Sequence, residues 1–264
     1  MKTTPITKAA DTFTNRFTES VRKYIQNRIK YFRVIAAVML EVKVLVTGAS
    51  GLLGRQVMAE LTAAGVPCLG LAHSRPGPGL VQLDLTDLAA ARSFVLEHKP
   101  SHVIHAAAQR FPDKVEADFE AAKLLNVETS RTIAEACQEA GARMIYISTD
   151  YVFPGDHPPY FPDNPARPLN KYGETKLAGE GAVLGAAAGH LVLRVPVLYG
   201  GVTQLTESAV TVLLEVVRRG APATVSSYEV RCPSHTRDIA RILRDLVSEI
   251  INKLKVSYPV ISGH

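Results

Sequence analysis

The sequence predicts an α/β protein in which helices cover both faces of one doubly wound parallel sheet. From residue 42 onward, short apolar runs rich in valine alternate with longer segments of helical period. A glycine-rich turn separates the first apolar run from the first helical segment. Repeated β-α-β order favours a parallel sheet, because the crossover helices have to pack on its faces. Hydrophobic residues make up 47% of the 264 residues, so a substantial core can form.

The strands are predicted from continuous apolar runs, which are typical of strands buried on both faces. In chain order they are KVLVT (43–47), VPCLGLA (66–72), LVQLD (80–84), SHVIHAAA (101–108), RMIYISTD (143–150) and HLVLRVPVLYG (190–200). Helices are predicted at 52–65, 85–100, 118–140, 170–188 and 237–255. We expect Gly65 to cap the end of the first helix and Thr86 to cap the start of the second.

The charge distribution separates the N-terminal 40 residues from the rest of the chain. Residues 1–40 contain eight Lys/Arg and two Asp/Glu, whereas the remainder contains 22 Lys/Arg and 23 Asp/Glu. We therefore expect a basic, poorly ordered extension (1–40) followed by a main domain (41–250). The extension has the composition of a mitochondrial transit peptide, but a solvated extension of a cytoplasmic protein is the simpler interpretation. The main domain has no basic excess that would indicate a nucleic-acid partner.

The sequence favours neither a membrane protein nor a metalloprotein. No apolar run is long enough to span a bilayer. Cys68, Cys137 and Cys232 have neither metal-ligand spacing nor a paired pattern. We expect a reduced, intracellular protein without a metal.

The turn GASGLLG after the first strand predicts a phosphate-binding site. Gly48 permits the tight turn, Gly51 lets a pyrophosphate approach the backbone, and Gly54 lets the helix pack closely on the sheet. The start of the following helix offers free N–H groups and the positive end of its dipole. A glycine triplet can be merely structural, but this one lies in a β-α-β unit.

The end of the second strand favours NADP over NAD. The residues His73, Ser74 and Arg75 include no acid that could bind a ribose 2′-hydroxyl, and the arginine suits a 2′-phosphate. A solvent-exposed arginine is the alternative. Asp84, after the third strand, is placed to accept from an adenine amino group, and a helix-capping role is the alternative mainly for Asp87.

The segment NKYGETKLAGE places Tyr172 and Lys176 four positions apart. On a helix this spacing brings both side chains to one face. A lysine beside a phenol can lower its pKa and make it a proton donor near neutral pH. The same pair could instead hold a cofactor ribose, or be an ordinary surface pair.

The motifs GASGLLG, HAAA, STDYVF, YGETK and LRVPVLYG occur in the order found in extended short-chain dehydrogenases/reductases, which this sequence resembles from residue 42 to 248. STDYVF with PLNKYGETKLAGE is similar to the dTDP-4-dehydrorhamnose reductase branch. Within that branch, ASGLLGRQV, YVFPGDHPPY and LTESAVTVLLEVV most resemble the regulatory β subunits of methionine adenosyltransferase. The resemblance implies a Rossmann-type, NADP-binding domain over residues 41–250.

The resemblance also implies roles for individual residues. In the reductases a tyrosine protonates the substrate oxygen, a lysine binds the nicotinamide ribose and a Ser or Thr orients the carbonyl. By the resemblance, these roles would fall to Tyr172, Lys176 and Thr149. Further implied cofactor contacts are Ser50, Leu52, Leu53, Leu85, Ala106, Arg110 and Leu198. The apolar members of this set are equally explained as core residues.

The resemblance implies a regulatory subunit that binds NADP and associates with the catalytic subunit of methionine adenosyltransferase, without being an enzyme itself. The alternatives are an NADPH-dependent sugar-nucleotide reductase and an inactive fragment. Family members continue well beyond the equivalent of Glu249, so the resemblance implies a truncated C-terminal substrate lobe and a divergent tail (251–264). This expectation puts partner binding in doubt more than NADP binding, and it predicts negligible turnover.

Overall fold

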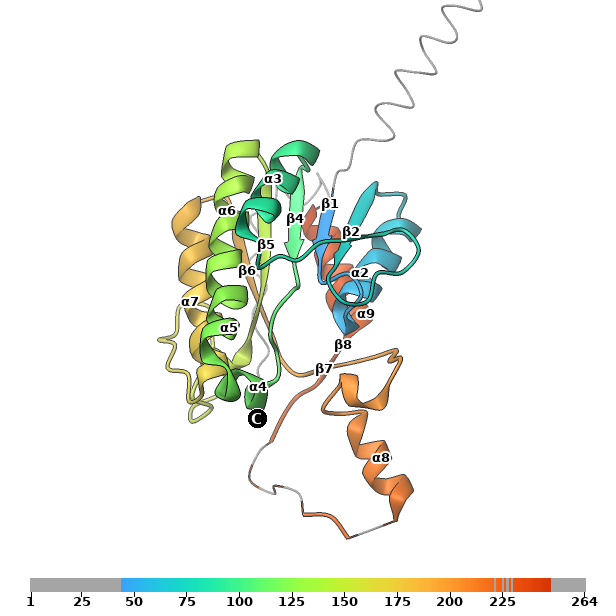
Figure 1. The fold of residues 1–264 in the computed structure, drawn as a ribbon. Coiled ribbons are helices and arrows are strands. Elements are labelled where there is room, and N and C mark those ends of the chain that lie inside the picture. Colours follow the sequence, from blue (N-terminus) through green and yellow to red (C-terminus); the bar gives the residue numbers. More distant parts are fainter. Residues whose placement is uncertain (1–43, 221, 225, 227, 229, 248–264) are drawn as a thin grey trace, which may run out of the picture. The chain divides into compact units, whose positions relative to one another are not determined.

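The computed structural model describes residues 44–247 except 221, 225, 227 and 229, and it confirms the predicted fold class (Figure 1). Six parallel strands form one sheet in the order β3-β2-β1-β4-β5-β6. The strands are β1 (Val44–Thr47), β2 (Cys68–Ala72), β3 (Leu80–Gln82), β4 (His102–His105), β5 (Arg143–Thr149) and β6 (Leu191–Val195). The predicted extension (1–40) and tail (251–264) lie outside the described residues.

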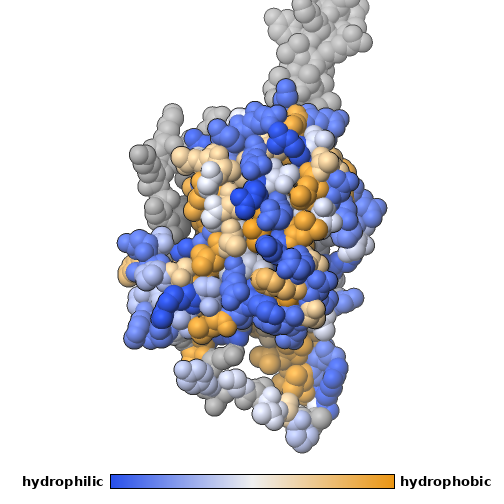
Figure 2. All heavy atoms as spheres, turned by 60° about the vertical axis from the view of Figure 1, so that its left-hand side comes forward, coloured by the Kyte–Doolittle hydropathy of each residue, from blue (hydrophilic) through white to orange (hydrophobic). Residues whose placement is uncertain are grey.

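Two layers of helices cover the sheet. The helices are α2 (Leu52–Ala63), α3 (Leu88–His98), α4 (Pro112–Ala117), α5 (Phe119–Lys123), α6 (Thr129–Ala140), α7 (Lys171–Ala186), α8 (Val212–Arg219) and α9 (Thr236–Val247). Helices α2 and α9 pack on one face, and α3, α6 and α7 pack on the other (Figure 1). Over α6 and α7 the molecular surface is mainly hydrophilic, with scattered apolar residues (Figure 2).

Each central strand contributes to both cores, which is why its sequence reads as a continuous apolar run. In β1, Val44 and Val46 pack towards α2 and α9, whereas Leu45 packs towards α3 and α6. All three side chains are at most 1% exposed. The alternation of the strand therefore fills two hydrophobic cores at once.

The start of α3 differs from the predicted cap. Asp87, not Thr86, is the N-cap: its side chain accepts a hydrogen bond of 3.0 Å from the backbone N–H of Ala90. The Thr86 hydroxyl instead donates to Asp84, at 2.7 Å. The carboxylate is the better acceptor for the helix N–H groups because it is charged. Gly65 does lie just beyond α2 in the left-handed conformation, with φ +69°.

Two predicted elements are divided in the structure. The predicted helix 118–140 consists of α5, a π-helical turn (Leu124–Glu128) and α6. The predicted strand 190–200 ends at Val195, before Pro196, whose nitrogen cannot donate to a sheet. Beyond the proline, β7 (Leu198–Tyr199) pairs with β8 (Ser234–His235) in a separate two-stranded sheet.

The strand order places the functional edge of the sheet. The chain leaves β1 towards β2 on one side, whereas β4 pairs with β1 on the other, and in open α/β sheets ligands bind where the strand order reverses in this way. The carboxyl ends of β1, β4 and β5 meet at this edge. Among the described residues no helix is long and apolar enough to cross a membrane, and no group of three or more potential ligands could hold a metal ion.

Candidate functional site

The glycine turn lies between β1 and α2, and its three glycines meet different constraints. Gly48 is left-handed (φ +66°), and a Cβ on it would lie 2.8 Å from the amide nitrogen of Ala107. A Cβ on Gly54 would lie 2.1 Å from the Gly48 carbonyl oxygen, so the fold itself requires both glycines. A Cβ on Gly51 would meet only that oxygen, at 3.1 Å. The fold therefore constrains Gly51 less tightly than Gly48 or Gly54, and a glycine at this position leaves space that a bound group could use.

The start of α2 suits an anion. Gly51 is the N-cap and provides no side chain to accept from the first N–H groups of the helix. These donors and the helix dipole favour a phosphate at this position. Leu52 and Leu53 are buried in the first turn of α2, and the Ser50 carbonyl accepts from Arg55 at 2.9 Å.

The two predicted adenosine-side segments lie close together. His73, Ser74 and Arg75 follow β2 and are exposed. The His73 Nε2 lies 3.7 Å from the carboxylate of Asp84. Hydrogen bonds from the hydroxyl and the N–H of Thr86 lower the pKa of Asp84, so one of its oxygens is already engaged. Leu85 is buried in the core beneath α3.

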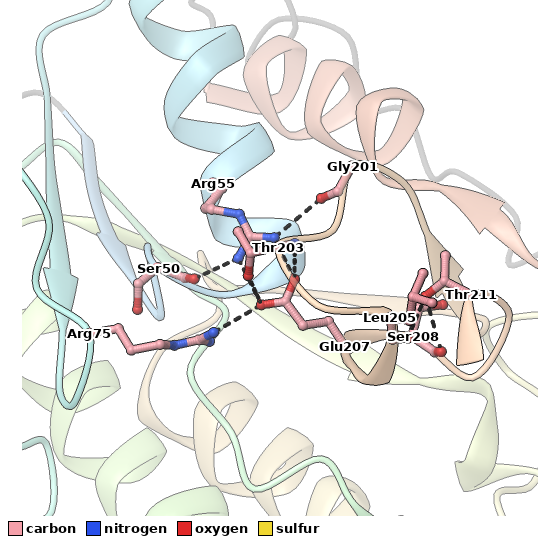
Figure 3. Close-up of polar contacts among 9 residues, drawn as sticks. All are labelled: Ser50, Arg55, Arg75, Gly201, Thr203, Leu205, Glu207, Ser208 and Thr211. Atoms are coloured by element: carbon pink, nitrogen blue, oxygen red, sulfur yellow. Dashed lines mark hydrogen bonds and ion pairs between the residues drawn. The ribbon is translucent and has the colours of Figure 1, made fainter. Parts of the chain in front are cut away.

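An acid that is remote in sequence reaches Arg75. The Nη1 of Arg75 lies 2.9 Å from Oε1 of Glu207, in a short 3₁₀ turn (Leu205–Glu207) before α8. Glu207 also accepts from both terminal nitrogens of Arg55, at 3.2 and 2.7 Å (Figure 3). Thr203 donates to it from its N–H and its hydroxyl. The acid-free end of β2 therefore still has a carboxylate beside its arginine, supplied by another part of the chain.

Arg55 and Glu207 were absent from the residues predicted from sequence. Arg55 follows directly after Gly54, and Glu207 lies in the segment LTESAVTVLLEVV. Both positions lie within motifs already recognised, but nothing in their local pattern indicates that they pair across 152 positions.

Thr149, Tyr172 and Lys176 are positioned by the end of β5 and the start of α7. Asn170 caps α7 by accepting a 2.8 Å hydrogen bond from the N–H of Gly173. Tyr172 therefore lies in the first turn, and Lys176 lies one turn further along the same face. A hydrogen bond joins Tyr172 to the side chain of Thr149.

The pKa of Tyr172 is shifted in the direction opposite to the one predicted. Burial raises it to about 12, and the hydrogen bond with Thr149 only partly counteracts this shift. The Nζ of Lys176 instead lies over the ring of Tyr146, 3.8 Å from its centre. Removal from water thus outweighs the stabilisation of the phenolate that a neighbouring cation was expected to give.

Lys176 is only 2% exposed, and burial lowers its pKa to about 7. Glu180 opposes this shift but does not cancel it. The carboxylate of Glu180 forms an ion pair with Arg194, at 2.7 Å, and accepts a hydrogen bond from the hydroxyl of Ser148. The lysine therefore lies in a buried site whose nearest acid is already neutralised by another cation.

A buried polar network lies beneath these residues, and the sequence did not indicate it. The main-chain oxygen of Asn126, in the π-helical turn, accepts from the hydroxyls of Ser130 (2.9 Å) and Tyr146 (3.2 Å). His105 joins Ser130 to Thr47, with contacts of 3.1 and 2.7 Å. Burial lowers the pKa of His105 to about 3, so the ring is neutral at physiological pH. The network fixes Tyr146, on whose ring Lys176 rests.

Arg110 links the two halves of the site. Its guanidinium stacks on Phe111, 4.2 Å from the ring centre. Burial lowers its pKa, whereas the charges of Tyr172 and Glu207 raise it, so Arg110 lies within electrostatic reach of both groups. Ala106 and Leu198, two further predicted contacts, are half-buried and pack against the core beneath α2. Arg55 and Arg75 contact the carboxylate of Glu207, and the charge of Arg110 interacts with the same carboxylate without contacting it.

Lys176 generates a stability prediction with a definite sign. Its pKa is 10.5 in water and about 7 in the folded protein. Between these values the unfolded chain binds more protons, so the contribution of Lys176 to the free energy of unfolding rises with pH. We expect Lys176→Met to lose this rise between about pH 7 and 9 in urea unfolding.

The measurement is a difference between two proteins. The raised pKa values of Cys137 and Tyr172 affect stability at higher pH, but they occur in both proteins and cancel. Lys171→Met removes an exposed lysine from the same helix and is the matched control. Equal changes of slope in the two variants would contradict the assigned shift.

Comparisons with known proteins agree with this geometry. Residues 42–259 match the RmlD substrate binding domain family. Methionine adenosyltransferase 2 subunit beta from Xenopus laevis is 43% identical over 222 residues, which are 84% of this chain and 65% of that protein. The chain thus spans less than two thirds of that relative's length.

Two solved structures have the same fold. A dTDP-4-dehydrorhamnose reductase from Clostridium acetobutylicum superposes with a TM-score of 0.69 and 30% identity, covering 78% of this chain and 70% of the other. The dTDP-4-dehydrorhamnose reductase from Bacillus anthracis, solved in complex with NADP, superposes with a TM-score of 0.69 and 28% identity. The match covers 78% of this chain and 71% of the other. The family match includes the glycine turn, the Thr149–Tyr172–Lys176 set and the Arg75 segment. The chain therefore belongs to the RmlD substrate binding domain family.

Proposed function

We propose that this protein is an NADP-binding regulatory subunit of methionine adenosyltransferase, which modulates the synthesis of S-adenosylmethionine from methionine and ATP. The observation that carries the proposal is the intact glycine turn at the start of α2, in a chain 43% identical to a methionine adenosyltransferase subunit. A regulatory role requires that the protein bind the dinucleotide, but it does not require that the dinucleotide react.

The residues present fit NADP. The turn at Gly51 and the start of α2 would receive the pyrophosphate. Arg75, at the end of β2, would receive the 2′-phosphate, since most of its donors are not used by Glu207. Tyr172 and Lys176 would hold the nicotinamide ribose. The NADP complex of the Bacillus anthracis reductase supports this assignment.

Arg75→Ala should weaken NADP binding about 10- to 100-fold, because a charge-assisted phosphate contact contributes roughly 1.5–3 kcal/mol. NAD binding should change much less, because NAD has no 2′-phosphate. Titration calorimetry with both dinucleotides measures the two effects. Gly51→Val is the companion variant: it fills the space for the pyrophosphate and should abolish binding of both. An unchanged NADP/NAD preference in Arg75→Ala would remove the assignment.

The partner is tested by capture on the catalytic subunit of methionine adenosyltransferase. We expect the full chain to be retained, and more strongly with NADP than without it. Gly51→Val should lose the increase that NADP produces while keeping any retention that does not depend on the dinucleotide. No retention in either condition would refute the regulatory assignment for this chain.

A second candidate function is a sugar-nucleotide reductase, which the hydrogen-bonded pair of Thr149 and Tyr172 favours. When bound, NADPH would supply a hydride. Tyr172 would donate the proton to the substrate oxygen, Thr149 would orient the carbonyl, and Lys176 would hold the ribose. Hydride transfer also requires a closed pocket that fixes the carbonyl close to the cofactor.

We expect turnover with a dTDP-4-keto-6-deoxysugar to be negligible. A phenol with a pKa of about 12 is a weak proton donor, and Lys176 lies against Tyr146 rather than in a position that lowers this pKa. The assay follows NADPH oxidation by absorbance. Sustained oxidation that disappears in Tyr172→Phe would establish the reductase instead.

A further inference from the structure

The segment before α8 folds back towards the glycine turn and is anchored there by Glu207. The side chain of Glu207 is 7% exposed. Its carboxylate receives two contacts from Arg55, two from Thr203 and one from Arg75 (Figure 3). Arg55 also donates to the carbonyl oxygens of Ser50 and Gly201, so it joins the turn to the same segment. Glu207 is therefore fixed at the edge of the proposed phosphate site.

The two arginines are bound to Glu207 with unequal strength. Arg55 makes a forked contact through both terminal nitrogens, and its side chain is 29% exposed. Arg75 makes one contact through Nη1, and its side chain is 56% exposed. Exposed single ion pairs are weak, whereas forked and partly buried ones are firmer. Arg75 can therefore exchange partners, while Glu207 stays with Arg55 and Thr203.

Glu207 is ionised at physiological pH. The hydrogen bonds from Arg55, supported by those from Thr203 and Arg75, hold the pKa of this carboxyl far below its usual range. A phosphate bound by Arg75 would thus lie close to a permanent negative charge. Like charges at such separations repel appreciably in a partly buried site.

We infer that Glu207 is a specificity-determining residue that competes with the 2′-phosphate for Arg75 and so lowers the preference for NADP over NAD. The inference rests on the proposed binding of NADP. NAD places no phosphate at Arg75, so it leaves this ion pair intact. NADP has to replace the contact between Arg75 and Glu207, and it keeps the repulsion from the carboxylate afterwards.

The opposite role would be positioning. A carboxylate that holds an arginine in its binding conformation raises affinity by reducing the rotamer freedom lost on binding. The two roles predict opposite signs for Glu207→Gln, which keeps the shape of the side chain and an oxygen for Arg55 and Thr203 but removes the charge. The sign of the change in the affinity ratio therefore decides between them.

The experiment measures the dissociation constants of NADP and NAD by calorimetry at low salt, for the wild type and Glu207→Gln. We expect the preference for NADP to increase roughly tenfold, which corresponds to about 1.4 kcal/mol. Glu215→Gln, which removes a carboxylate that pairs with Arg219 in α8 and not with Arg75, should leave the preference unchanged. The gain should be smaller in an Arg75→Ala background, because the competed arginine is absent there.

The outcomes separate this inference from the proposed function. If the wild type binds neither dinucleotide, the proposed function fails and the inference fails with it. If the wild type binds NADP and the preference in Glu207→Gln is unchanged or lower, only the inference is overturned. Glu207→Asp provides a second variant if Glu207→Gln does not fold. Its shorter side chain withdraws the carboxylate from Arg75 and should raise the preference partially, and an unchanged or lower preference would again overturn the inference.

Discussion

The backbone of the turn after β1 packs directly against the backbone that leaves β4, and only glycine fits between them. A Cβ on Gly48 would lie within 3.0 Å of atoms of Ala106 and Ala107. The same contact sets where α2 starts and brings the ends of two central strands to one edge of the sheet. The placement of the proposed phosphate site, of Arg55 and, through Glu207, of the segment before α8 all depends on it. The site is thus a consequence of how closely two chain segments approach.

Burial then sets the chemistry of the groups at this edge. The same loss of water lowers the pKa of Lys176 and raises that of Tyr172, so each side chain moves towards its neutral form. Glu207 moves in the other direction because several donors satisfy its charge. The groups around the arginines therefore stay charged at this edge of the sheet. The groups around Tyr172 have pKa values shifted towards their neutral forms. This division is the one that the proposed NADP site requires.

The sequence predicted the features that have a local cause. Six strands, the glycine turn and the helix carrying Tyr172 each follow from hydrophobic periodicity or from residues with special backbone requirements. The ion pair between Arg75 and Glu207 spans 132 positions, and no local pattern reports it. The direction of the Tyr172 pKa shift was wrong because the spacing of a tyrosine and a lysine does not reveal how much water either one loses. The predicted cap of α3 was Thr86, but the structure has Asp87 in this role. Either residue type can cap a helix, so the sequence alone does not decide between two such neighbours.

The π-helical turn has a consequence for how this site can change during evolution. One extra residue in a turn shifts the rotational phase of the helix by about 100° between α5 and α6. The atom of Asn126 that accepts from Ser130 and Tyr146 belongs to the main chain, so its position is set by the path of the helix. The buried side chain of Asn126 has a separate task, because it bonds to Gln109 and Thr175. A single-residue deletion in the turn would rotate the main-chain acceptor away. Part of the support beneath Lys176 is therefore encoded in the length of a helix rather than in the identity of a side chain.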